Sequence, residues 1–154
     1  MNSKDNINLE PTVRSSAALP AFPVDADLFF ALELTSRRIA CDQDQMLFHQ
    51  DDEPVGLYLI RSGLAYAMIQ VDGGRPVACF QANRGAILGL PAVVSNRPYS
   101  LSAVARTVAD ICFVGKETFD ELLRVQPSIY ISVLKILAAE VRMSRAALSK
   151  DCRH

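Results

Sequence analysis

Residues 57–63 read Leu57-Tyr58-Leu59-Ile60-Arg61-Ser62-Gly63, a compact apolar run that closes in a turn. A run of this length bounded by turn residues is typical of a buried strand. Residues 64–71 again resemble a strand, and they end at Asp72-Gly73-Gly74-Arg75, where glycine tolerates the positive φ values of a tight hairpin. Pro76 can begin the return strand, residues 77–80. The pattern therefore predicts an antiparallel hairpin in the middle of the chain.

Strand-like segments continue on both sides of this hairpin, from residue 39 to about residue 115. Residues 101–105 and 111–114 are two further apolar runs, with a turn expected near Ala109-Asp110. Many short strands at close spacing are typical of an antiparallel barrel or a jelly roll. We therefore expect a mainly β fold.

Helices are predicted on either side of the barrel. Apolar residues recur at helical spacing in residues 26–38 and 116–125, and Pro127 suits the first turn of a long helix that continues to residue 148. Residues 1–24 are polar and contain three prolines, which predicts a flexible arm. The expected organisation is an arm (1–24), a β-barrel domain with flanking helices (25–126) and a long C-terminal helix (127–150).

The composition fits one globular domain. The chain has 154 residues, of which 50% are hydrophobic and 21% charged, and its net charge is −1. Such a charge gives no bulk attraction to nucleic acid or to an anionic membrane. No apolar run is long enough to cross a bilayer, and residues 1–6 lack the pattern of a secretion signal. We expect a cytoplasmic protein without membrane contact.

Neither a metal site nor a catalytic centre is predicted. The cysteines are far apart and form no C-x-x-C pair (Cys41, Cys79, Cys112 and Cys152). His49 is a lone internal histidine, and residues 51–53 form an acidic turn of the kind that is usually solvated. No catalytic triad, phosphate loop or zinc-protease motif is present. We expect no cofactor and no enzymatic activity.

Several motifs together resemble the sensor domain of the catabolite-activator and fumarate–nitrate-regulator (Crp/Fnr) superfamily, a relative of cyclic-nucleotide-binding domains. The likeness rests on residues 46–52, 57–63, 85–90 and 119–148, and it covers residues 39–148 in all. It implies a jelly-roll sensor barrel followed by a helix that pairs two subunits. The family's iron–sulfur branch uses N-terminal cysteines, and none precedes Cys41.

The resemblance also implies a phosphate-binding cassette, but its key residues are replaced here. In nucleotide-binding relatives a Gly-Glu pair begins the cassette, and an Arg-Ser or Arg-Thr pair near its end grips the cyclic phosphate. An ungapped placement puts Gly89 and Leu90 on the first pair, and Ser100 and Leu101 on the second. A cyclic phosphodiester is a permanent anion that needs a charged donor such as arginine. The cassette is therefore degenerate.

The candidate effector pocket comprises the cassette positions and the polar or aromatic residues near them. Arg97 and Ser102 are the nearest replacement donors, although Arg97 stands in a turn expected to be exposed and Ser102 at a strand start where serine often bonds to backbone. Alternatively, Leu88, Leu90 and Leu101 fill the pocket. The candidate residues are Gly89, Leu90, Arg97, Tyr99, Ser100, Leu101 and Ser102.

The last predicted helix carries an apolar stripe that favours a homodimer. One such helix cannot bury the whole stripe on a small barrel, and relatives pair it with its twin across a two-fold axis. The chain ends at His154 with no helix-turn-helix module, so no direct DNA binding is expected. The predicted dimer residues are Ile129, Val133, Ile136, Leu137, Val141 and Leu148.

Three functions remain open at this point. The first is a stand-alone dimeric regulatory module that responds to a small effector or a protein partner. The second is a cyclic-nucleotide receptor, or a fragment of a transcription regulator, with non-standard nucleotide contacts through Arg97, Ser100 and Ser102. The third is a structural interaction protein whose pocket is filled. Co-purification with a small molecule separates the first two from the third.

Overall fold

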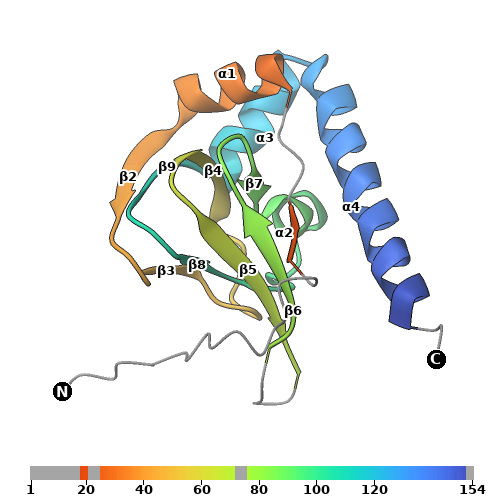
Figure 1. Ribbon diagram of the computed structural model, residues 1–154. Helices are drawn as coiled ribbons and strands as arrows, with labels where there is room; N and C mark the ends of the chain where they lie inside the picture. Colours follow the sequence, from red (N-terminus) through yellow and green to blue (C-terminus); the bar gives the residue numbers. More distant parts are fainter. Residues whose placement is uncertain (1–17, 21–24, 72–75, 152–154) are drawn as a thin grey trace.

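The computed structural model describes residues 18–20, 25–71 and 76–151. Two sheets lie beside a layer of helices, and the long final helix runs along one side of the molecule (Figure 1). The helices are α1 (Ala26–Thr35), α2 (Leu90–Ser95), α3 (Lys116–Val125) and α4 (Ile129–Asp151). The strands are β1 (Ala18–Pro20), β2 (Arg37–Cys41), β3 (Met46–Phe48), β4 (Gly56–Ser62), β5 (Ala65–Gln70), β6 (Pro76–Ala82), β7 (Ile87–Leu88), β8 (Ser102–Ala105) and β9 (Ala109–Gly115).

The sheets confirm the predicted mainly β class with flanking helices. One sheet has the order β1-β6-β5-β8-β3 and the other the order β2-β9-β4-β7. Apart from the parallel pair of β1 and β6, the strand pairs are antiparallel, including the predicted hairpin of β5 and β6. Within the described residues no strand pair joins the two sheets, so the jelly roll is an open barrel. The predicted turn at residues 72–75 lies outside the described residues.

Two predicted boundaries were wrong. The helix expected over residues 26–38 ends at Thr35, because Ser36 takes an extended conformation and the next five residues pair with β9 as strand β2. The turn expected near Ala109-Asp110 lies earlier in the chain. Ala109 is already the first residue of β9, and Thr107 at the true reversal donates its backbone N–H to Leu64.

Three elements were not predicted. β1 lies within the segment expected to be a flexible arm and pairs with β6, Ala18 opposite Cys79. The remainder of that arm lies outside the described residues. β7 and α2 occupy the segment expected only to contain turns and a short apolar run, and α2 begins after Gly89, whose φ is 89°.

The hydrophobic residues form two cores on opposite faces of β4. Leu57 and Leu59 point toward α1, α3 and α4, whereas Tyr58 and Ile60 point into the barrel. This alternation follows from the two-residue period of a strand. The helices therefore cover one face of the four-stranded sheet, and the interior between the sheets is left for a separate set of side chains.

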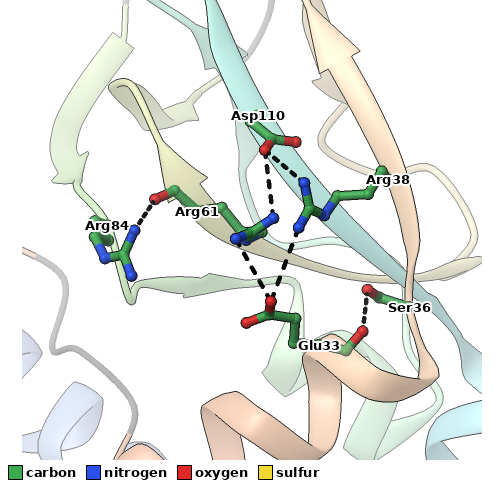
Figure 2. A network of polar contacts seen from close by, with 6 residues as sticks. All are labelled: Glu33, Ser36, Arg38, Arg61, Arg84 and Asp110. Atoms are coloured by element: carbon green, nitrogen blue, oxygen red, sulfur yellow. Dashed lines mark hydrogen bonds and ion pairs between the residues drawn. The ribbon is translucent and has the colours of Figure 1, made fainter.

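A charged network joins α1 to strands β2, β9 and β4 of the four-stranded sheet (Figure 2). The Arg61 guanidinium lies 3.5 Å from the Glu33 carboxylate and 3.6 Å from the Asp110 carboxylate. Arg38 lies 3.0 Å from Asp110 and 3.8 Å from Glu33. Each charge in the network thus faces an opposite charge. Ion pairs this exposed are worth about 0–1 kcal/mol each, so they orient α1 more than they stabilise it.

Candidate functional site

A cavity of about 450 Å³ lies between the barrel interior and α4. Strands β3, β5, β6 and β7, helix α2 and the segment after α2 form its barrel wall, and the second half of α4 forms the opposite wall. Most of its surface is apolar. The residues that line it are Phe48, Ala67, Ile69, Phe80, Ile87, Leu88, Gly89, Pro91, Ala92, Tyr99, Ser100, Leu101, Leu137, Glu140, Val141, Met143, Ser144 and Arg145.

Tyr99 is the most firmly held side chain of the barrel wall. Its hydroxyl donates to the Gly56 carbonyl at 2.6 Å and accepts the N–H groups of Gly56 and Val55 at 3.2 Å each. Its ring stacks on Phe48 with the ring centres 4.1 Å apart. Burial raises the pKa of the phenol, so the hydroxyl stays neutral and keeps its proton for Gly56.

Gly89 lets the start of α2 approach this tyrosine. Its φ of 89° is a conformation that side-chain-bearing residues rarely adopt, and a Cβ atom there would lie 3.0 Å from the Tyr99 ring and 3.2 Å from the Gly56 carbonyl oxygen. Both the backbone angle and the space therefore require glycine. Glycine at this position thus permits a close contact between the start of α2 and the ring of Tyr99.

The structure brings together four of the seven predicted pocket residues. Gly89, Tyr99, Ser100 and Leu101 line the cavity. Leu90 is fully buried in the other core, beneath the helices.

The other two predicted residues also lie outside the cavity lining. Arg97 is exposed, and Ser102 is buried with its hydroxyl accepting the Gln50 N–H at 2.8 Å. Leu88 and Leu101 line the cavity without filling it.

The α4 wall was not predicted as part of the pocket. Leu137, Glu140, Val141 and Ser144 recur at intervals of three, one and three residues, which places them on one helical face. Such spacing is visible in the sequence, but it does not say whether the face meets the cavity or a partner. Leu137 and Val141 were in fact predicted as dimer residues.

Glu140 is the half-buried charged residue of the cavity lining. Burial alone raises the pKa of its carboxyl from 4.5 to about 7, with no positive group opposing the effect. Within the described residues its carboxylate has neither an ion pair nor a hydrogen bond. Arg145 is the other charged residue of the lining, and it is exposed.

The predicted dimer residues divide between the core and the cavity. Ile129, Val133 and Ile136 are buried against the chain's own helices and sheet, and Leu137 packs beside them. Val141 is 49% exposed. The side chain of Leu148 lies outside the described residues.

The described residues show no candidate metal cluster, and two of their cysteines are buried as thiols. No group of three histidine, cysteine or acidic residues converges among them. The lone His49 lies 3.7 Å from Asp52, both being exposed. Burial raises the pKa of the Cys41 and Cys79 thiols, which disfavours the reactive thiolate. Among the described helices, none has the length and apolar character to cross a bilayer.

Comparisons with known proteins agree with this architecture. Lysophospholipase nte1 of Neosartorya fischeri is 27% identical over 131 residues, which is 84% of this chain but only 8% of that protein. The chain thus spans less than a tenth of the length of this curated relative. The Thermus thermophilus catabolite activator protein superposes with a TM-score of 0.72 at 22% identity, over 81% of this chain and 59% of that one.

A cyclic nucleotide-binding domain from Methylobacillus flagellatus also superposes with a TM-score of 0.72, at 21% identity over 84% of this chain and 75% of that one. The sequence profile of the family described as the cyclic nucleotide-binding domain matches residues 38–126, more than half of the chain. That range contains strands β3 to β9, most of β2, and helices α2 and α3. This chain therefore belongs to the cyclic nucleotide-binding domain family.

Proposed function

We propose that this domain is a regulatory sensor module that binds a small effector other than a cyclic nucleotide and acts through α4. The observation that carries the proposal is the two-sided cavity, with Leu137, Glu140 and Val141 of α4 opposite the barrel wall. A bound molecule would contact both at once and so change the position of the helix. A volume of about 450 Å³ lies within the range of small-molecule sites.

The composition of the barrel wall argues against a cyclic nucleotide. The positions that match the family's phosphate-gripping pair are Ser100 and Leu101, and neither can offer a charged donor. Arg97 does not line the cavity. Losing a hydrogen bond to a charged group costs about 1.5–3 kcal/mol. With such losses, a nucleotide would bind at least about tenfold more weakly than in a relative with a complete cassette.

One observation favours the alternative, a cyclic-nucleotide receptor with non-standard contacts. Arg145 lines the cavity from α4 and could supply the positive charge that the cassette lacks. It is exposed, however, and water screens a guanidinium in that position. The same wall carries Glu140, whose negative charge would oppose a phosphate.

A thermal-shift titration with cyclic AMP and cyclic GMP tests the proposal. A ligand present at a hundred times its dissociation constant stabilises a fold by about 2.7 kcal/mol. For a domain of this size the melting temperature would then rise by about 5–10 °C. We expect no saturable shift with either nucleotide, and a small molecule retained by the purified protein in native mass spectrometry. A saturable rise would instead establish the nucleotide receptor.

The regulatory output that we propose is a homodimer formed through an exposed apolar face of α4 that adjoins the cavity wall. Ile131, Leu134 and Val141 are 57%, 59% and 49% exposed, and Ala138 between them is exposed as well. We call these four residues the α4 seam. Their spacing of three, four and three residues matches the 3.5-residue repeat of a coiled coil. A contiguous apolar seam of this kind is unusual on a monomer.

A charge placed in the seam tests the dimer. We expect Leu134→Glu to convert the protein to a monomer in sedimentation-velocity or light-scattering measurements, because two seams would bury opposing carboxylates. Val108→Glu is the matched control, since Val108 is 72% exposed and lies on the turn before β9. A wild-type protein that is already monomeric at high concentration would refute the dimer and leave the cavity proposal standing.

The proposed role is regulatory and not catalytic. The described residues contain no candidate metal cluster, and the match to the relative named as a lysophospholipase covers less than a tenth of that protein's length. We propose that the module controls a protein to which it binds or is joined. A net charge of −1 gives it no general attraction to DNA.

A further inference from the structure

The cavity has a charge pattern that predicts the kind of molecule it accepts. Its barrel wall is formed mainly by apolar and aromatic side chains such as Phe48, Phe80 and Leu101. Its charged groups, Glu140 and Arg145, both come from α4. A ligand that fits must therefore be largely apolar, with its polar group turned toward the helix.

Glu140 dominates the electrostatics of the α4 wall. It is half-buried, whereas Arg145 is exposed at the mouth of the cavity. Burial is the sole cause of the raised pKa of the Glu140 carboxyl, so the Arg145 guanidinium does not neutralise it. Partly removing a carboxylate from water without a partner costs free energy. A positive group that pairs with the carboxylate offsets that cost.

We propose that the cavity selects a small, largely apolar amine whose ammonium group pairs with Glu140 and whose apolar body lies against the barrel wall. This inference rests on the proposed function, since it names the ligand class of the same cavity. The ammonium group gives the Glu140 carboxylate the charged partner that it lacks among the described residues. A phosphate or carboxylate ligand would meet the like charge of Glu140 in the same apolar surroundings and bind more weakly.

Three probes with the same aromatic body and different polar groups test the charge preference. Phenethylamine, phenethyl alcohol and hydrocinnamate carry an ammonium, a hydroxyl and a carboxylate, and their binding is measured by ligand-observed NMR and calorimetry. A hydrogen bond to a charged group is worth about 1.5–3 kcal/mol, so we expect the amine to bind about 10- to 100-fold more tightly than the alcohol. Hydrocinnamate should bind most weakly.

Two variants identify the responsible residue. Glu140→Gln keeps the size of the side chain and removes its charge, and it should make amine and alcohol bind alike. Arg145→Gln is the control on the same wall and should not weaken the amine. If the alcohol or hydrocinnamate binds as tightly as the amine, or if Glu140→Gln keeps the preference, the amine proposal is wrong while the cavity remains a binding site. If none of the probes binds, the small-effector proposal fails as well.

Discussion

The raised pKa of Glu140 makes the stability of the fold depend on pH. An unfolded chain ionises this carboxyl near its ordinary pKa of 4.5, whereas the folded protein holds the proton up to about pH 7. Between these values the folded state binds more protons, so its stability rises as the pH falls from 7 toward 4.5. Above pH 7 the folded state carries an ionised, half-buried carboxylate, and this part of the stability is lost.

The size of the effect follows from the two pKa values. At about 1.36 kcal/mol for each pH unit, the difference between 4.5 and about 7 amounts to at most about 3 kcal/mol. The amide of Glu140→Gln does not ionise, so the stability of this variant lacks this dependence on pH. Wild type should therefore gain about 2–3 kcal/mol relative to this variant when the pH is lowered from about 8 to about 5. Histidines and other carboxyls titrate in both proteins and cancel in the comparison.

Urea unfolding at the two pH values measures this difference. With a slope of about 1–3 kcal/mol per molar urea, the wild-type midpoint should move by about 1 M or more relative to Glu140→Gln. Among the described residues lining the cavity, Arg145 is the other charged one, and its exposure limits its influence on Glu140. Asp120→Asn, at an exposed position on α3, is the control and should show no such change. A difference between wild type and Glu140→Gln that stays constant with pH would refute the reasoning.

Two further substitutions test the barrel wall. Tyr99→Phe leaves the Gly56 carbonyl and N–H without their hydroxyl partner, and we expect a loss of about 1–3 kcal/mol in urea unfolding. Tyr130→Phe, at a 47% exposed position, should change the stability little, and equal effects of the two would contradict this account. Gly89→Ala should cost at least about 1–2 kcal/mol, because its φ is 89° and its Cβ would press on Tyr99. Gly115→Ala, whose Cβ would meet its nearest neighbour at 3.9 Å, should leave the melting temperature nearly unchanged.

The sequence predicted those parts of the fold in which the local residue pattern favours the same conformation that the tertiary structure requires. The apolar run at residues 57–60 became the centre of β4, and the helix expected over residues 116–125 is α3 with the same bounds. The helix that ends at Thr35 was predicted too long, because its continuation is decided by pairing with β9. A partner about 70 residues away leaves no local signal in Arg37–Cys41.

The residues of the candidate site also divide into those that the sequence could predict and those that depend on tertiary packing. The resemblance to the cassette predicted Gly89, Ser100 and Leu101, and these residues line the cavity, but it predicted Leu90 equally, and Leu90 is buried in the other core. Glu140 was not found, because a single glutamate in an amphipathic helix is most often solvated. Its significance arises only where α4 passes the barrel and water is excluded from one face of the helix. No sequence motif predicts this tertiary contact between α4 and the barrel.

In the proposed module, regulation does not depend on the charged residues that are replaced in the cassette. In the proposed module the barrel supplies an apolar wall, and the charge that selects the ligand lies on the moving element itself. Val141 lines the cavity and also belongs to the α4 seam, so in the proposed module one turn of helix would meet both the ligand and the second subunit. A ligand shifts an equilibrium only by its difference in affinity for the two states. A charged hydrogen bond to Glu140 that forms in one helix position alone would supply about 1.5–3 kcal/mol, enough for a shift of about 10- to 100-fold.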